Sequence, residues 1–165
     1  MAIFHAARFA AFALILCAAP VALAEGTSVA FGGLKADTSL PVEMKSDALS
    51  VNQADGNAVF TGNVVVTQGA MKLSAAEIRV EYSKDKKAIE TLNAKGGVLL
   101  VNASDAAQAD QAIYTISRGE VVMTGNVLLT QGQAAMSAQK LIIDLKTGTG
   151  RMEGRVTTTF TPGAN

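Results

Sequence analysis

The residues of this chain that could carry out chemistry are mainly carboxylates. Asp47, Asp55, Asp105 and Asp110 lie near predicted turns, and a pair of such groups could act as general acid and base, as in glycoside hydrolysis. Asp is also common at turns for backbone reasons alone, because its side chain bonds to nearby amides. No Asp-x-Asp calcium loop is present in the sequence. We therefore expect these carboxylates to be structural, and we predict no cofactor and no metal.

The single histidine and the single cysteine, His5 and Cys17, both fall in the first 24 residues. This segment has the pattern of a secretory signal, with Arg8, an apolar run over 9–23 and the cleavage pattern Ala22-Leu23-Ala24. Cleavage after Ala24 would leave a mature chain without His or Cys. That excludes the usual catalytic triads, thiol nucleophiles and most zinc sites. The sequence therefore predicts an exported protein that is not an enzyme and needs no disulfide.

Basic side chains offer a second kind of chemistry, the binding of phosphates. Loss of Arg8 with the signal leaves 13 basic and 14 acidic residues, a net charge of −1, so a nucleic-acid partner is not expected. The basic residues are scattered among acidic ones, which favours solvated faces over a phosphate site. The candidates for a phosphate contact are Lys72, Arg79, Lys95, Arg118 and Lys140.

A phrase of nine residues occurs twice and indicates how the chain is built. T-G-N-V-V-V-T-Q-G at 61–69 returns as T-G-N-V-L-L-T-Q-G at 124–132, and weaker copies begin at Gly96 and Gly154. The four lead glycines are 34, 29 and 29 residues apart, a period typical of stacked architectures. We interpret each unit as a strand, a glycine corner and a second strand in a facing sheet. A phosphate loop is not expected, because no helix follows the glycine.

Short β-rich runs separated by turn signals predict an all-β fold. Ile78, Val80 and Tyr82 alternate with polar residues, and Leu141 and Ile143 do the same in the second copy. Each strand thus has one apolar and one solvated face, and the apolar face must be buried against another layer.

The chain divides into four predicted segments. A cleaved signal peptide (1–24) is followed by a flexible lead-in (25–39), where glycines and the nearby Pro41 are expected to exclude regular elements. A single β domain covers 40–161, and a disordered tail covers 162–165.

The pattern at the start of the domain is similar to that of a known family. S-L-P-V-E-M-K-S-D at 39–47 is followed by A-V-F-T-G-N-V-V-V-T-Q-G at 58–69, S-A at 74–75 and V-E-Y at 80–82. This run resembles the OstA-like family of periplasmic lipopolysaccharide-transport proteins, and the resemblance extends over 40–160. It implies a V-shaped β-jellyroll of stacked antiparallel strands with open edges and an apolar cleft. It also implies molecules that stack end to end and carry lipopolysaccharide from an inner-membrane-anchored partner to an outer-membrane barrel.

A cleft for the acyl chains of lipid A would have to shield methylenes worth about 0.8 kcal/mol each. Aliphatic side chains without buried charge suit that lining. Alternation alone does not distinguish an open cleft from a closed core, and both interpretations stay open. The candidate lining residues are Val59, Val64, Val66, Leu73, Ile78, Val80, Tyr82, Val98, Leu100, Tyr114, Val127, Leu129, Leu141, Ile143 and Leu145.

The open ends of such a sheet could bind other chains, because their backbone N–H and C=O groups lack partners. The run at 156–161 is one predicted edge and the run at 40–53 is the other, and pairing them head to tail would not close into a ring. The candidates for edge docking are Leu49, Val51, Val156, Thr158 and Phe160. A periplasmic scaffold that polymerises without cargo is the alternative function.

Overall fold

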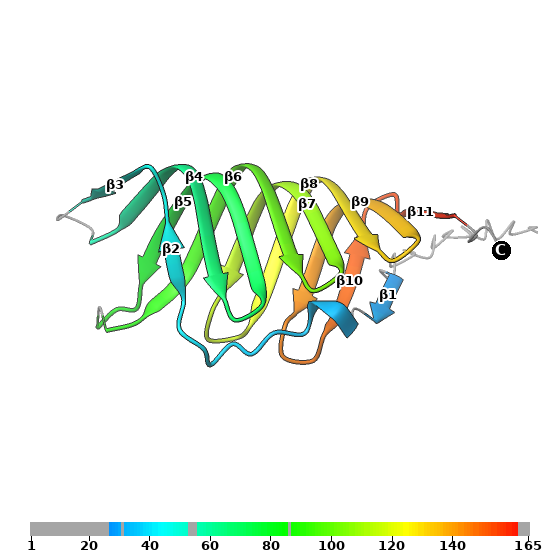
Figure 1. The fold of residues 1–165 in the computed structure, drawn as a ribbon, viewed down its shortest axis with the longest axis horizontal. Helices are drawn as coiled ribbons and strands as arrows, with labels where there is room; N and C mark the ends of the chain where they lie inside the picture. The colour runs from blue at the N-terminus through cyan, green and yellow to red at the C-terminus, as the bar shows by residue number, and fades with distance from the viewer. Residues whose placement is uncertain (1–26, 31, 53–55, 86, 162–165) are drawn as a thin grey trace, which may run out of the picture.

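The computed structural model describes residues 27–30, 32–52, 56–85 and 87–161, and nearly all of its elements are β-strands (Figure 1). Among these residues, no helix has the length and apolar character needed to cross a membrane. The elements in chain order are β1 (Thr27–Ala30), η1 (Gly32–Leu34), β2 (Glu43–Lys45), β3 (Ala48–Val51), β4 (Ala58–Gln68), β5 (Met71–Tyr82), β6 (Ile89–Asn102), β7 (Asp105–Thr115), β8 (Glu120–Gln131), β9 (Ala134–Asp144), β10 (Thr149–Glu153) and β11 (Thr157–Phe160).

The strands form one antiparallel sheet in which β4 to β9 follow one another in chain order, whereas β1 pairs with β10 at the far end. The order is β1-β10-β9-β8-β7-β6-β5-β4-β2, with β3 also paired to β4 and β11 also paired to β9. The sheet is not closed, and the strands follow one another along the long axis of the molecule (Figure 1). The predicted all-β fold of stacked antiparallel strands is therefore confirmed.

The long strands bend midway, and the four lead glycines lie at the bends. Gly62, Gly96, Gly125 and Gly154 have φ values of 77°, 85°, 80° and 81°, in the left-handed region that favours glycine. The pairing registers of β4, β6 and β8 shift beside these glycines. The prediction of glycine corners is confirmed: Gly154 lies between two strands, β10 and β11, whereas the other three corners lie inside one continuous strand each.

Two of the lead glycines are followed by an asparagine, which bonds to an aspartate of the adjacent chain segment. Asn63 Nδ2 donates to Asp47 Oδ2 over 2.8 Å, and Asn126 Nδ2 donates to Asp110 Oδ2 over 2.9 Å. Two of the carboxylates weighed above as catalytic groups are thus bonded to corner asparagines. The repeated Gly-Asn pair therefore has a structural reason, because the glycine permits the bend and the asparagine fixes it.

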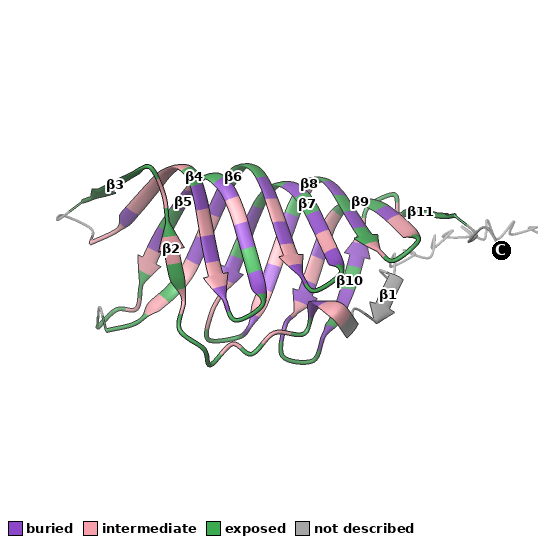
Figure 2. Ribbon diagram, in the orientation of Figure 1, coloured by how far each residue is buried: buried purple, intermediate pink, exposed green. Residues whose placement is uncertain are grey.

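The corners fold the sheet into two leaves that share one hydrophobic core. The β2 leaf contains β2, β11 and the parts of β4–β9 on their side of the corners, at 64–68, 71–75, 98–102, 105–109, 127–131 and 134–138. The β3 leaf contains β1, β3, β10 and the other parts of β4–β9. Buried residues alternate with half-buried and exposed ones along the central strands, and β3 and the turns are exposed (Figure 2).

The segment before β2 has more regular structure than expected. β1 pairs with β10 over four residues, and η1 follows it. The expectation that glycines and Pro41 exclude regular elements here is wrong, because pairing with β10 and the burial of Leu34 (0% exposed) outweigh local propensity.

Candidate functional site

The faces that the two leaves turn toward each other are apolar except at the turns of the β2 leaf, where Gln68, Asn102 and Asp105 are buried. Three rows of paired residues line this interior, and we call them the inner rows. None of the three contains a charged residue. Two rows belong to the β3 leaf and one to the β2 leaf: Leu49, Phe60, Ile78, Ala94, Ala112, Met123, Leu141, Met152; Val51, Ala58, Val80, Leu92, Tyr114, Val121, Ile143, Gly150; and Met44, Val66, Leu73, Leu100, Ala107, Leu129, Met136, Thr158.

The structure brings most of the predicted lining residues together in this interior. Tyr82 follows the inward-facing Ile78 and Val80 but lies near the end of β5 and is 38% exposed. Val59 lies opposite Arg79 on the outer face, so its assignment to the lining is wrong, because Ala58 and Phe60 hold the inward positions of β4. The residues buried in the core are Val64, Val66, Leu73, Ile78, Val80, Val98, Leu100, Tyr114, Val127, Leu129, Leu141, Ile143 and Leu145.

Apolar side chains of the edge strands are exposed at the two ends of the sheet. Leu49 and Val51 on β3 are 56% and 59% exposed, and Phe160 on β11 is 65% exposed. Thr158 is also exposed, and Val156 is half-buried beside the last corner. The predicted edge-docking residues therefore do lie at or next to the free edges of the sheet, and docking at these edges stays a prediction.

The side of the molecule opposite the corners, which we call the mouth, lies between the hairpin turns of the two leaves. Residues 33–40, which we call the strap, run along the mouth (Figure 1). Ala36 N donates to Leu145 O over 2.9 Å at the β9–β10 turn, and Asn102 Nδ2 donates to Lys35 O over 2.9 Å at the β6–β7 turn. The strap thus joins the two leaves, with fully buried Leu34 packed in the core.

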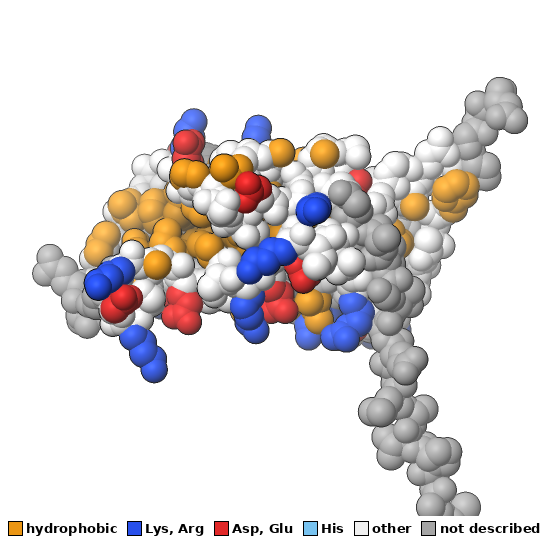
Figure 3. All heavy atoms as spheres, turned by 90° about the horizontal axis from the view of Figure 1, so that it is seen from below, with side chains coloured by type: hydrophobic (Ala, Val, Ile, Leu, Met, Phe, Trp, Pro, Cys, Tyr) orange, Lys and Arg blue, Asp and Glu red, His pale blue; other side chains and the backbone are white. Residues whose placement is uncertain are grey.

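Hydrophobic side chains remain visible from the mouth on one half of the molecule. Seen from below, they gather in a hollow toward the end that carries β3, whereas polar atoms cover the middle (Figure 3). Leu40 lies against Gly69 at the β4–β5 turn and Tyr82 ends β5, both toward the β3 end of the sheet, and they are 42% and 38% exposed. The interior is therefore closed in its central part and accessible near β3.

A buried polar connection joins both leaves to the strap. Tyr114 on the β3 leaf donates its hydroxyl proton to Gln68 Oε1 on the β2 leaf over 2.6 Å. Gln68 Nε2 donates in turn to the carbonyls of Thr38 and Leu40, over 3.0 and 2.8 Å. Gln68 and Tyr114 are 1% and 0% exposed. The repeated Gln-Gly pair was the sequence signal for this connection, but the backbone acceptors in the strap have no sequence signature.

A second buried polar group lies at the next turns along the mouth. Asp105 is 2% exposed and accepts a hydrogen bond from Gln131 Nε2 over 3.0 Å. Its carboxylate also lies against Gly33 of the strap, where an added Cβ would approach Asp105 Oδ2 to 2.5 Å. Gln68 and Gln131 occupy equivalent places in the two repeats, and both make hydrogen bonds with groups at the mouth. This region holds the leaves and the strap together and has no evident catalytic geometry.

The hydroxyl of Tyr114 makes a testable contribution to stability at alkaline pH. Burial raises the pKa of Tyr114 to about 12 from 10.0, because the folded protein disfavours the phenolate. The stabilisation is therefore complete below pH 10 and is lost as the pH rises toward about 12. Tyr114→Phe should lower the free energy of unfolding by about 1–3 kcal/mol at pH 8, since Gln68 Oε1 loses its donor. The difference from wild type should shrink above pH 10.

Denaturant unfolding between pH 8 and 12 measures this difference directly. Tyr82→Phe is the matched control, because it removes the other tyrosine hydroxyl from a position that is 38% exposed. A wild-type advantage over Tyr114→Phe that stays constant up to pH 12 would show that the buried hydroxyl does not titrate as described.

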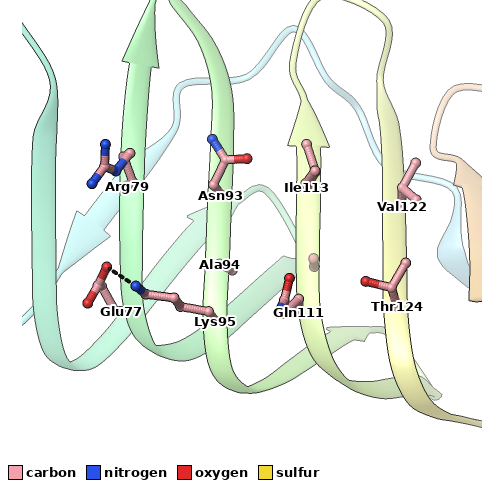
Figure 4. Close-up of a pocket in the computed structure, with 10 residues that line it drawn as sticks. Glu77, Arg79, Asn93, Ala94, Lys95, Gln111, Ile113, Val122 and Thr124 are labelled. Carbon is pink, nitrogen blue, oxygen red and sulfur yellow. Dashed lines mark ion pairs between the residues drawn. The ribbon is translucent and has the colours of Figure 1, made fainter. Parts of the chain in front are cut away.

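The outer face of the β3 leaf mixes polar side chains with the apolar side chains of Val59, Ile113, Val122 and Ile142. A shallow hollow of about 170 Å³ lies across β5–β8, with Arg79, Asn93, Ile113 and Val122 along it (Figure 4). Lys95 Nζ lies 2.9 Å from Glu77 Oε1. Among the described residues, no group of three or more His, Cys, Asp or Glu side chains could hold a metal ion.

The basic residues weighed above as phosphate ligands do not form one cluster, although Arg79 and Lys95 both line the hollow on the outer face (Figure 4). Lys95, Lys140 and Arg118 pair with Glu77, Glu153 and Glu120 at 2.9, 3.7 and 3.3 Å. Arg79 and Lys72 are exposed on the outer faces of different leaves. Their placement agrees with the expectation of solvated faces.

Known proteins share this architecture. The crystal structure of LptH, the LptA homologous periplasmic component of the lipopolysaccharide transport device of Pseudomonas aeruginosa, superimposes with a TM-score of 0.68 at 19% identity. The superposition covers 77% of this chain and 99% of LptH. It shows that the two proteins have the same fold.

Sequence relatives agree with this result. An uncharacterized protein of Rhizobium meliloti is 28% identical over 149 residues, which cover 84% of this chain and 80% of that protein. The lipopolysaccharide export system protein LptA of Escherichia coli is 29% identical over 111 residues, which cover 64% of this chain and 60% of that protein.

The family match covers more than half of the chain. Residues 43–149, from β2 to the start of β10, match the family described as LptA/(LptD N-terminal domain) LPS transport protein. This match confirms the resemblance that the repeated Gly-Asn-Val and Gln-Gly pattern carried. The chain belongs to the LptA/LptD N-terminal domain family of lipopolysaccharide transport proteins.

Proposed function

We propose that this chain is a periplasmic carrier that shields the acyl chains of lipopolysaccharide between its two leaves during transport from the inner to the outer membrane. The observation that carries the proposal is the absence of charge from all three inner rows, which run through every strand from β4 to β9. Family membership and relatives named for lipopolysaccharide export support it.

The physical requirement for such a carrier is continuous apolar cover. An acyl chain of a dozen carbons exposes methylenes worth on the order of 10 kcal/mol in water, at about 0.8 kcal/mol each. Uncharged inner rows provide that cover without a strong polar contact that would hold the lipid in one place. The hollow at the β3 end of the mouth (Figure 3) is the proposed entrance, and exposed Tyr82 ends β5 toward that end of the sheet.

The proposed partners follow from the two open edges. An inner-membrane-anchored protein and an outer-membrane protein of the same transport system would extend the sheet at its two ends, and further copies of this chain would stack head to tail between them. Leu49, Val51, Val156, Thr158 and Phe160 are the proposed docking residues. Cleavage after Ala24 would release the mature protein into the periplasm.

One observation favours the alternative, a scaffold without cargo. The central interior is packed, with Leu34, Leu100, Leu129 and Ile143 all 0% exposed. A carrier must therefore open its leaves to admit lipid in this region, whereas a scaffold need not. The photo-crosslinking experiment described in the Discussion distinguishes the two functions.

Depletion of the protein from its native cells tests the transport proposal. Newly made lipopolysaccharide should then accumulate at the inner membrane, because the carrier between the membranes is missing. Pulse-labelling followed by membrane fractionation measures this, and re-expression of the wild-type chain serves as the control. Normal arrival of labelled lipopolysaccharide at the outer membrane in depleted cells would rule the proposal out.

A further inference from the structure

β1 occupies the same rows of the sheet as β3, although the two strands lie at opposite ends of the molecule (Figure 1). Ser50 begins a row that passes through β4–β9 to Arg151, and Arg151 pairs with Ser28. Val51 begins the adjacent row, which ends at Gly150, and Gly150 pairs with Val29. The Ser-Val pair of β1 therefore has the same register as the Ser-Val pair of β3.

The direction of β1 also matches that of β3. β2 and β3 pair with the two halves of β4, and β10 and β11 pair with the two halves of β9, so each pair acts as one bent strand. With β4–β9, the sheet has eight bent strands, and the first therefore runs antiparallel to the last. A second copy could add its β2 to β11 and its β3 to β10 and continue the antiparallel pattern. β1 runs antiparallel to β10, as that β3 would.

We infer that β1 is a built-in substitute for β3 of a second copy, so that end-to-end assembly requires β1 to leave the edge of β10. This inference rests on the assembly part of the proposed function. β1 offers four residues, whereas an incoming copy offers the seven residues of β2 and β3 on adjoining edges. The longer pairing can displace the shorter one.

The register selects a second copy as the occupant, because the inner rows would continue across the junction. Leu49 of the incoming copy would stand beside Met152, in the row of Leu141 and Ile78. Leu49 is 56% exposed in the single chain and would gain Met152 as an apolar neighbour, whereas Val51 would stand beside the backbone of Gly150. Displacement of β1 would thus join the interiors of two copies.

Two pairs of cysteine substitutions test this inference in the mature chain, which has no native Cys if the signal is cleaved. Ser28→Cys with Arg151→Cys places thiols on directly paired residues, whose Cα separation of about 4.5–5.5 Å suits a disulfide. Oxidation should lock β1 in place and weaken self-association at least tenfold relative to the same protein after reduction. Sedimentation velocity of the two redox states measures this.

The second pair tests the register between copies. Ser50→Cys with Arg151→Cys cannot close within one chain, because seven strand spacings of about 4.8 Å separate the two residues. It should instead give disulfide-linked dimers and longer ladders on non-reducing gels. Ser50→Cys with Thr149→Cys is the control, since Thr149 lies two residues out of register, and it should give at most a tenth of the product. Ser50→Cys alone controls for symmetric dimers.

Three results would overturn the inference: equal self-association of the oxidised and reduced Ser28/Arg151 pair, self-association without Ser50–Arg151 ladders, or no self-association of any form. Lipopolysaccharide capture by a photo-crosslinker at Tyr82 should be measured in the same samples. If lipopolysaccharide is still captured while the Ser28–Arg151 disulfide has no effect on self-association, only the role of β1 is refuted and the carrier proposal stands. If no lipopolysaccharide is captured while the Ser28–Arg151 disulfide does weaken self-association, only the carrier proposal is refuted.

Discussion

Gly125→Ala should lower the free energy of unfolding by about 2–3 kcal/mol, because Gly125 lies at a corner that both its backbone and its neighbour restrict. Its φ of +80° costs an L-residue about 1–2 kcal/mol. An added Cβ would also overlap the carboxylate of Asp110 and approach Asp110 Cβ to 3.0 Å. Moving Asp110 away would break its 2.9 Å hydrogen bond with Asn126, at a further cost of about 1 kcal/mol.

Gly97→Ala is the matched control for this prediction. Gly97 has the same φ of +80°, but an added Cβ would meet nothing within 4 Å. It should therefore show only the backbone cost, about 1–2 kcal/mol. Urea unfolding of both variants gives the comparison. Equal losses would mean that the contact with Asp110 contributes nothing, and no loss in Gly125→Ala would contradict the account of the corners.

The repeats made half of the corners predictable from sequence. A glycine with positive φ marks the corner in β4, β6, β8 and after β10, because other residues rarely adopt that conformation. The intervening strands bend without a glycine, as at Ala76 in β5 and Gln139 in β9, which lie against Gly96 and Gly154. Composition gave no sign of these corners.

A subtler sequence signal for the corners without glycine does exist. In β5 the buried residues switch from odd-numbered positions, Leu73 and Ala75, to even-numbered ones, Ile78 and Val80. In β4 the inward-facing residues stay at even-numbered positions on both sides of the glycine corner, from Ala58 and Phe60 to Val64. A switch of the apolar residues between odd- and even-numbered positions within one strand therefore indicates a bend where no glycine is present.

The candidate site was predictable only in part, for a similar reason. Period-two alternation located most of the interior, because every strand buries one face. The strap could not be foreseen, since Lys35, Thr38 and Leu40 bind Asn102 and Gln68 through backbone carbonyls that every residue carries. For the same reason, sequence left open whether the interior is a cleft or a core.

Photo-crosslinking should distinguish the inner face from the outer face almost completely if lipid travels between the leaves. Tyr82 lies near the hollow at the β3 end, and Ile143 lies in an inner row deep in the core. Arg79 and Ile142 lie on the outer faces of the same two strands and are the matched controls. Because the paired positions are at most three residues apart, differences in local lipid concentration cannot explain a contrast between them.

The most direct measurement places a benzophenone side chain at each of these four positions in living cells and detects lipopolysaccharide adducts after irradiation. Circular dichroism of each purified variant confirms that it is folded, which matters most at Ile143, and the 38% exposed Tyr82 is the more tolerant position. We predict adducts at Tyr82 and Ile143 at least tenfold above those at Arg79 and Ile142. Folded variants that give no more adduct at the inner positions than at the outer ones would contradict the carrier function.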